Sequence, residues 1–106
     1  MFESTLRDDG QYDVTFSLPW EIRALVIHLL IDWDKWDRNA HPMRRKRQDD
    51  GRWTVTLSLP PGRHCYFYMV DRERMTDMSP DGHAHDDVLD LDCALLILPI
   101  PNLSSA

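Results

Sequence analysis

Two seven-residue segments of the chain alternate strictly between apolar and polar side chains, and this period of two restricts the possible folds more than any other feature. Every second residue is apolar in Tyr12–Leu18 and again in Trp53–Leu59, where the intervening residues are Thr and Ser. Successive side chains of a strand point to opposite faces of a sheet, so this pattern is typical of a strand with one buried and one solvated face. Both segments therefore predict antiparallel β-structure.

A third segment, residues 64–70, is apolar on both faces and rich in aromatic residues, which favours a strand near the middle of a sandwich. Residues 88–92 alternate more weakly. The sequence Pro-Pro-Gly at 60–62 separates the third segment from Trp53–Leu59. Proline presets the backbone of a turn and glycine supplies a positive φ, so a β-hairpin is predicted over residues 53–70.

Residues 21–36 fit two different structures. Apolar side chains recur there with the spacing of one helical face, at Ile22, Leu25, Val26, Leu29, Leu30 and Trp33. Ala24, Ile27 and Ile31 lie off that face, however, and the β-branched residues of the segment favour a strand that is buried on both sides. The local pattern alone leaves a helix and a strand equally open.

The size and charge of the chain limit the classes of function. Its 106 residues are enough for one domain with one core, and 42% hydrophobic and 28% charged residues are typical of a soluble globular protein. The formal net charge of −6 argues against nucleic acid as a partner, because phosphate binding needs a basic surface. The basic run at residues 44–47 is followed by Asp49 and Asp50, so it is interpreted as the solvated flank of a hairpin.

No segment predicts export or membrane insertion. Residues 1–10 are polar and acidic, and the apolar run at residues 94–100 is too short to span a bilayer. Without an export signal, Cys65 and Cys93 are expected to be reduced thiols of a cytoplasmic protein that makes no membrane contact.

The sequence carries no catalytic motif and no cofactor-binding motif. Nucleophile elbows, phosphate-binding glycine loops and histidine–glutamate metal motifs are absent, and the chain has only four glycines. His83 and His85 precede Asp86 and Asp87, a composition that could hold zinc or nickel, but no second group of ligands has matching spacing. Residues 83–87 are therefore interpreted as a polar loop, and no catalytic residue, metal or cofactor is predicted.

Five short motifs occur in order across roughly half of the chain. They are residues 27–36, Pro42-Met43, Asp50-Gly51-Arg52-Trp53, Leu59-Pro60-Pro61-Gly62 and the aromatic segment 66–71. In order and spacing they resemble the early-set domain at the N-terminus of isoamylases and glycogen branching enzymes. The same domain forms carbohydrate-binding module family 48 and the glycogen-binding domain of the AMP-activated protein kinase β subunit. The resemblance favours a strand at residues 24–31 and implies an all-β, immunoglobulin-like β-sandwich of about seven strands, in a single domain spanning residues 1–106.

The resembling family binds α-glucans through a small set of side chains, of which this chain keeps one at its matching position. Trp36 stands where the family has a sugar-contacting tryptophan. Phe67 replaces a lysine often found in the aromatic strand, and Arg74 stands where a second tryptophan is expected. Two glycines of the pattern are replaced by Ile31 and Arg72. The resemblance implies a partly degenerate carbohydrate-binding site made by Trp36, Asp34, Lys35, Asn39 and Arg74.

Each of the four tryptophans has its own expected place. Sugar rings present an apolar face ringed by hydroxyls, which an exposed indole with polar neighbours can bind, and Trp36 has such neighbours. The alternative for Trp36 is a packing role against its loop. Trp33 replaces a phenylalanine that is usually buried in the family, so it is expected in the core, as is Trp53 at the start of its strand. Trp20 follows Pro19 at the edge of a loop and fits either environment.

The apolar residues 94–100 lie beyond the place where the last strand of the family should end. Residues 94–106 are accordingly predicted to be an apolar C-terminal extension. An exposed apolar strand invites pairing with another chain. A homo-oligomer or a docked partner is therefore favoured over packing of this segment along the chain's own sandwich.

These expectations combine into one function and one alternative. The chain is predicted to be a non-catalytic, cytoplasmic module that binds an α-glucan such as glycogen or starch. Its partner is then the glucan itself or a glycogen-metabolising enzyme. The alternative is a protein-interaction or self-association module that kept the fold and lost sugar binding.

Overall fold

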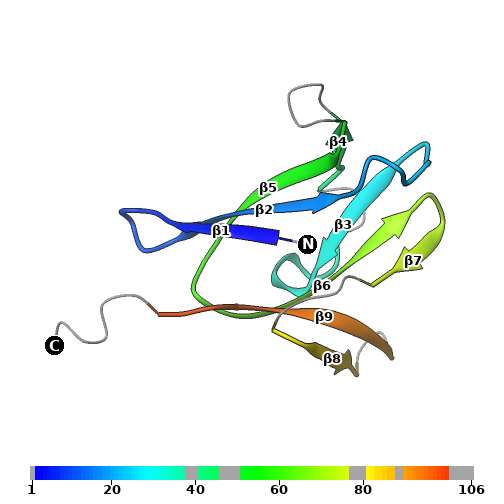
Figure 1. Cartoon of the computed structure of the whole chain (residues 1–106). Helices are drawn as coiled ribbons and strands as arrows, with labels where there is room; N and C mark the ends of the chain where they lie inside the picture. Colours follow the sequence, from blue (N-terminus) through cyan, green and yellow to red (C-terminus); the bar gives the residue numbers. More distant parts are fainter. Residues whose placement is uncertain (1, 38–40, 46–50, 77–80, 88–89, 101–106) are drawn as a thin grey trace, which may run out of the picture.

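A computed structural model describes residues 2–37, 41–45, 51–76, 81–87 and 90–100 of the chain. They form two antiparallel sheets that pack against each other as two layers (Figure 1). The first sheet has the strand order β1-β2-β5-β4 and the second the order β3-β6-β9-β8, with the short β7 paired to β6. The elements are β1 (Phe2–Leu6), β2 (Tyr12–Leu18), β3 (Ile27–Ile31), the 3-10 helix η1 (Asp32–Asp34), β4 (Arg44–Arg45), β5 (Trp53–Leu59), β6 (Gly62–Val70), β7 (Glu73–Met75), β8 (His83–Asp86) and β9 (Leu91–Leu98). The predicted all-β sandwich is confirmed.

The two strictly alternating segments are neighbouring strands of the first sheet. β2 pairs with β1 on one side and with β5 on the other, in a register that places Phe16 opposite Val55. Phe16 is fully buried, as the inward half of the alternation requires. On the outward half, the hydroxyls of Thr15 and Thr56 lie 2.9 Å apart and form a hydrogen bond.

The segment that fitted both a helix and a strand is a strand. β3 pairs with β6 along its whole length, and β6 lies between β3 and β9, as its two apolar faces predicted. Ile27 and Ile31, which lie off the helical stripe, are fully buried in this arrangement. A helix with one apolar face would have left them in water. Within the described ranges, no helix has the length and apolar character needed to cross a bilayer.

The core between the sheets is built around a chain of aromatic rings. The ring centroids of Phe16 and Tyr66 are 4.9 Å apart, and those of Tyr66 and Tyr68 are 5.9 Å apart. Burial raises the pKa of the Tyr68 phenol far above its ordinary value, and the neighbouring Tyr66 adds to the shift. The Tyr12 hydroxyl donates a hydrogen bond of 2.7 Å to the carbonyl of Pro99, which ties the end of β9 to the first sheet.

The predicted hairpin over residues 53–70 is wrong. β5 pairs with β2 and β4, whereas β6 pairs with β3, β7 and β9, so the two strands belong to different sheets. Gly62 has a φ of 134°, a conformation that L side chains rarely adopt, where the chain enters the second sheet. Just beyond it, Nε2 of the buried His64 lies 2.9 Å from the Pro60 carbonyl. Turn residues predict that the chain changes direction, but they do not specify which sheet the next strand joins.

The C-terminal apolar residues complete the second sheet instead of extending beyond it. β9 pairs with β6, with Ala94 opposite Tyr66 and Leu98 opposite Gly62, and it pairs with β8 on its other edge. Alternate side chains of β9 are buried in the core. The prediction of a C-terminal extension is therefore wrong for residues 94–98, and residues 101–106 lie outside the described residues.

The expected polar loop at residues 83–87 is largely a strand. β8 covers His83–Asp86 and pairs with β9, with Ala84 opposite Cys93. Of the weakly alternating residues 88–92, the first two lie outside the described residues and the last two belong to β9. Cys65 and Cys93 do not form a disulfide in the structure.

Candidate functional site

The outer face of the second sheet carries two rows of side chains that point away from the core. Alternation along each strand places His28 and Leu30 of β3 on this face, together with Phe67 and Met69 of β6. Leu30 lies opposite Phe67, and His28 lies opposite Met69. Leu30 and Phe67 are each only 2% exposed although they face outward, so another part of the chain covers their row.

Trp36 is the side chain that covers this row. Its ring centroid lies 5.4 Å from that of Phe67, and the two ring planes are inclined by 32°. Leu30, Phe67 and Cys93 form a small buried cluster of their own, separate from the main core, and Trp36 packs against it. Trp36 is itself only partly buried. It therefore has the packing role that was one of its two predicted roles, and part of its indole still reaches solvent.

The backbone that carries Trp36 is a tight turn directly after β3. The N–H of Lys35 donates to the Asp32 carbonyl and the N–H of Trp36 donates to the Ile31 carbonyl, each at 3.0 Å. Lys35 and Trp36 both adopt left-handed conformations, with φ of 62° and 64°. Such a conformation costs a non-glycine residue about 1–2 kcal/mol, and it is found where surrounding contacts hold a functional side chain in place. Two successive left-handed residues turn the indole back over β6.

Asp34 holds this turn in position. Its Oδ1 accepts a hydrogen bond of 3.3 Å from the Asp37 N–H, and its Oδ2 pairs with Nε2 of His41. The carbonyl of His41 in turn accepts a 2.9 Å hydrogen bond from the Leu29 N–H of β3. The Asp34 carboxylate thus joins the Trp36 turn to the segment that runs beside β3, and both of its oxygens are engaged within the protein.

The other predicted site residues lie at different distances from Trp36. Arg74 is exposed on β7 and lies opposite Met69, so it shares the outer face of the second sheet with Trp36. Met69 is two residues after Phe67 on β6, so Arg74 lies about 7 Å further along the strand direction than Phe67. Lys35 is exposed in the turn itself. Asn39 lies outside the described residues. We use the term outer-face platform for the surface formed by His28, Trp36, Phe67, Met69 and Arg74.

Three members of the platform, His28, Phe67 and Met69, were not predicted as site residues from the sequence. His28 and Met69 form a row with Arg74, because His28 is opposite Met69 on one side and Arg74 is opposite Met69 on the other. Alternate residues of a strand share one face even where both faces are apolar. Once the register between β3 and β6 is known, this rule places His28, Phe67 and Met69 together on the outer face. The platform combines an indole, a thioether, an imidazole and a guanidinium, which suits a ligand with flat apolar faces and hydroxyl groups.

The remaining tryptophans differ in burial. Trp53 is buried as predicted, and its Nε1 donates a 3.1 Å hydrogen bond to the Ile22 carbonyl. Trp33 is 51% exposed, so its predicted place in the core is wrong, because η1 turns it away from the sandwich. Trp20 is 57% exposed.

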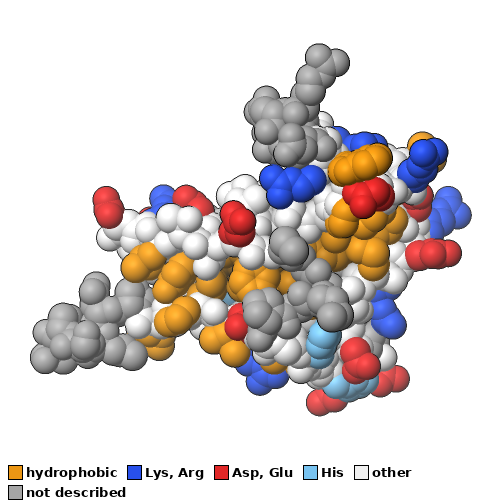
Figure 2. All heavy atoms as spheres, viewed as in Figure 1, with side chains coloured by type: hydrophobic (Ala, Val, Ile, Leu, Met, Phe, Trp, Pro, Cys, Tyr) orange, Lys and Arg blue, Asp and Glu red, His pale blue; other side chains and the backbone are white. Residues whose placement is uncertain are grey.

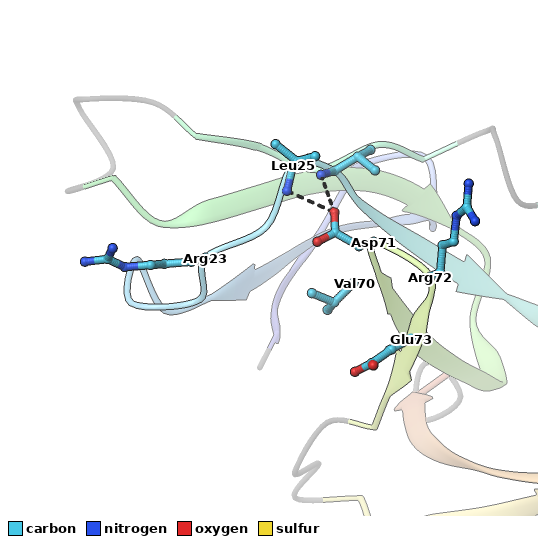
Figure 3. A pocket seen from close by; sticks show the side chains of 7 residues that line it. Arg23, Leu25, Val70, Asp71, Arg72 and Glu73 are labelled. Atoms are coloured by element: carbon cyan, nitrogen blue, oxygen red, sulfur yellow. Dashed lines mark hydrogen bonds between the residues drawn. The ribbon is translucent and has the colours of Figure 1, made fainter.

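A depression of about 690 Å³ lies where the β2–β3 connection meets the β6–β7 turn (Figure 3). It is lined by Leu25, Val26, Val70, Arg23, Asp71, Arg72 and Glu73. Figure 2 shows hydrophobic side chains gathered over the ends of β3 and β6, bordered by basic and acidic ones. Leu25 is 95% exposed, and an aliphatic side chain offers no flat ring on which a sugar could stack.

His85 of β8 takes part in a hydrogen-bonded group at the edge of the second sheet. Nδ1 of His85 lies 2.9 Å from Asp92, and its Nε2 lies 3.1 Å from Asp90. These hydrogen bonds, first with Asp92 and then with Asp90, raise the pKa of His85 above its ordinary value. In the part of the chain that the structure describes, no three His, Cys, Asp or Glu side chains are arranged as a metal site.

Comparison with known families supports the resemblance that the motifs suggested. Residues 1–90 match the sequence profile of a family described as carbohydrate-binding module 48 (isoamylase N-terminal domain). The match includes the Trp36 turn and every residue of the outer-face platform. It ends just before β9, which completes the second sheet.

Proposed function

The chain belongs to carbohydrate-binding module family 48, and from this membership we propose that it is a non-catalytic module that binds α-glucans of the glycogen or starch type. The family is one of binding modules, and carbohydrate binding follows from membership.

The observation that carries the proposal is the arrangement of Trp36 on the outer-face platform. The indole rests on Phe67 at 5.4 Å, in a turn held by the Asp34–His41 pair, so its orientation is set before any ligand arrives. A preorganised aromatic ring loses little conformational entropy when a sugar stacks on it. Arg74 and His28, in the next row, offer hydrogen-bond partners for the sugar hydroxyls.

We expect this binding to be weak, because the site is partly degenerate. Phe67 lies under Trp36 instead of offering a charged group to the ligand, and Arg74 supplies donors but no second ring. Lys35 and Asn39 are proposed as further contacts of the sugar, whereas the engaged carboxylate of Asp34 supports a positioning role. A weak module reaches useful affinity when a polymeric glucan offers many sites, or when a glycogen-metabolising enzyme works beside it in the cytoplasm.

Calorimetric titration with maltoheptaose, together with co-sedimentation with glycogen, tests this proposal. Trp36→Ala is expected to lower the affinity by about tenfold or more. Trp36→Phe keeps an aromatic ring and should retain most of the binding. Trp33→Ala is the matched control, because Trp33 is an exposed tryptophan at the start of the same turn. Absence of binding at millimolar maltoheptaose, or binding that Trp36→Ala leaves unchanged, contradicts the proposal.

A second candidate function is favoured by one observation, the depression beside Leu25. An aliphatic side chain that is 95% exposed, in a depression that Arg23 and Arg72 also line, suits a protein partner better than a sugar (Figure 3). The alternative of a protein-interaction or self-association module therefore depends on this end of the sandwich. Light scattering of the full chain and of Leu25→Asp distinguishes the two, since a dimer that Leu25→Asp dissociates would favour self-association.

A further inference from the structure

Trp20 presents another exposed indole, at the end of the first sheet. It follows β2 and is 57% exposed, although it is among the largest apolar side chains of the protein. It lines a depression at the end of that sheet together with Ser17, which points outward, with the buried Leu18 and with the exposed Arg52. The outer-face platform, by contrast, belongs to the second sheet.

The turn that carries Trp20 is fixed by several hydrogen bonds. The N–H of Ile22 donates to the Pro19 carbonyl at 3.2 Å, and the carbonyl of Ile22 accepts from Nε1 of the buried Trp53 at 3.1 Å. Arg45 reaches the turn from β4, where its Nη2 lies 3.5 Å from the Trp20 carbonyl. An exposed indole on a fixed backbone resembles Trp36 in its turn, and it is likewise ready to bind without reordering the chain.

Arg45 is itself held in a defined place. Its Nε donates to the Gly51 carbonyl at 3.0 Å, and its guanidinium carbon lies 5.4 Å from the centre of the Trp53 ring. Gly51 has a φ of 75°, and a Cβ at this position would lie 3.7 Å from that of Trp20. The support of the Trp20 turn is therefore built from two strands and a glycine that passes close by.

Polar side chains continue from Trp20 along the outer face of the first sheet. A depression of about 240 Å³ lies between Trp20, Glu21 and Arg52. It shares Ser17 and Arg52 with a second depression of about 200 Å³, which also has Glu3, Thr15 and Thr54 in its wall. Carboxylates, hydroxyls and a guanidinium therefore line the two depressions, the first of which also contains the Trp20 indole. Together these polar groups supply both hydrogen-bond donors and acceptors.

This mixture of groups fits a neutral, hydroxyl-rich ligand better than other classes. An anion would call for a cluster of cations without carboxylates, whereas here Arg52 lines the depressions together with Glu3 and Glu21. Arg45 is engaged with the Gly51 and Trp20 carbonyls. An apolar peptide would need a larger hydrophobic groove than these two small depressions provide. A sugar needs a ring to stack on and paired polar groups at its edge, and the first sheet provides both.

We propose that Trp20 and Arg52 form a second α-glucan-binding surface, on the sheet opposite the outer-face platform. The choice of ligand rests on the proposed function, and the site itself rests on the exposed indole and its polar neighbours. Trp20 stacks on the sugar ring, while Arg52 and the nearby carboxylates bond its hydroxyls. Because the two surfaces lie on opposite sheets, one molecule joins two glucan chains, and binding to a branched polymer becomes multivalent.

Nuclear magnetic resonance of the indole N–H groups tests the second surface directly, with maltoheptaose as the probe. The Trp20 and Trp36 signals, each assigned by its loss in the corresponding Trp→Ala variant, are both expected to shift. The Trp20 shift should persist in Trp36→Ala, and Arg52→Ala should weaken it about tenfold. Leu25→Ala, a change of an exposed residue in the same β2–β3 connection, is the control and should leave both shifts unchanged.

Glycogen provides the second measurement, because a monomer with two binding surfaces cross-links it, whereas a dimer with one surface per protomer would keep this ability in Trp20→Ala. The native protein is expected to make a glycogen solution turbid, whereas Trp20→Ala and Trp36→Ala each still sediment with glycogen but lose the turbidity. Trp20 is exposed, so its variant should keep the native melting temperature, which circular dichroism verifies.

The outcomes separate the two proposals. A Trp20 signal that stays still while the Trp36 signal saturates overturns the second surface and leaves the proposed function standing. Shifts at Trp20 alone support the second surface and contradict the role of Trp36. If neither signal moves at millimolar maltoheptaose, both proposals are overturned.

Discussion

The indole of Trp36 lies on the phenyl ring of Phe67, with 5.4 Å between their centroids and 32° between their planes. Phe67 belongs to the central strand of the second sheet, and Trp36 belongs to the turn after β3. This contact therefore connects the indole of the outer-face platform to the central strand of the second sheet. Stability and sugar binding should consequently respond together when this contact is changed.

Replacement of Phe67 by alanine tests that connection. Phe67 is only 2% exposed, so Phe67→Ala should lower the free energy of unfolding by about 3–4 kcal/mol. The same variant should weaken maltoheptaose binding, since Trp36 loses the ring that supports it. Urea denaturation gives the first quantity and calorimetry the second. Leu25→Ala removes an exposed aliphatic side chain and should change stability by less than about 0.5 kcal/mol; equal effects of the two variants would show that Phe67 is not part of a packed cluster.

The pairing of Asp34 with His41 should be worth more to the Trp36 turn than to the fold as a whole. His41→Ala is expected to weaken glucan binding, Asp34→Ala should weaken it more because it also removes the acceptor of the Asp37 N–H, and the double variant should be no worse than Asp34→Ala. Such non-additivity is expected if His41 acts on the turn only through Asp34. Asp37→Ala changes a neighbouring exposed carboxylate and serves as the control. Additive losses in the double variant would show that Asp34 contacts the sugar independently of His41.

Much of the sandwich could be predicted from the sequence, because burial in a sheet leaves a period of two. β2 and β5 follow from this rule, and the central β6 follows from an aromatic-rich segment that is apolar on both faces. The link between β5 and β6 does not, since a Pro-Pro-Gly turn is compatible with a hairpin and with a crossing between sheets. The two strands differ in pattern, since β5 alternates between apolar and polar residues whereas most of β6 is apolar on both faces. This difference indicates that the two strands have different neighbours.

The candidate site was less accessible to sequence reasoning. Trp36 and Arg74 came from the family resemblance, and their place on one face depends on the register of β6 with β3 and β7. Trp33 was misplaced because a motif position says which residue replaces another, but not how a short 3-10 turn orients it. The apolar residues after 93 lie beyond the pattern of the resembling family, and their role depends on the pairing of β9 with the free edge of β6, which the local sequence does not specify.

Asp71 should stabilise the end of the sandwich through its carboxylate. Its Oδ1 accepts hydrogen bonds from the N–H groups of Leu25 and Val26, at 2.9 and 3.0 Å, while its own backbone has a φ of 56° (Figure 3). Asp71→Ala should lower the free energy of unfolding by about 2 kcal/mol, because it removes the acceptor and leaves an alanine in a left-handed conformation. Asp71→Asn keeps an acceptor and tolerates that conformation, so it should lose about half as much.

Urea denaturation of these two variants gives the comparison, with Arg72→Ala as the control on the neighbouring exposed residue. If Asp71→Asn is as damaging as Asp71→Ala, the charge of the carboxylate matters more than its geometry. If neither differs from Arg72→Ala, the clamp on residues 25 and 26 contributes nothing to stability.

His85 should make the stability of the protein depend on pH from about 6.5 upward. Its hydrogen bonds with Asp92 and Asp90 raise its pKa in the folded protein above the value of about 6.5 that it has when unfolded. A raised pKa means that the folded state holds the proton more tightly, so the stabilisation is fully present below pH 6.5 or so. It is lost as the pH rises through the folded pKa.

Melting temperatures between acidic and alkaline pH should therefore show a gap between the native protein and His85→Ala that is widest below neutrality and closes as the pH rises. Titration of the His85 ring by nuclear magnetic resonance checks the cause. Asp92→Asn should lower the pKa of His85 more than Asp90→Asn does, since the hydrogen bond with Asp92 makes the larger contribution. Asp87→Asn, a change of an exposed carboxylate just after β8, is the matched control and should leave that pKa where it is. A stability gap that widens toward alkaline pH would mean that His85 is bound in its neutral form, contrary to the hydrogen bonds with its two aspartates.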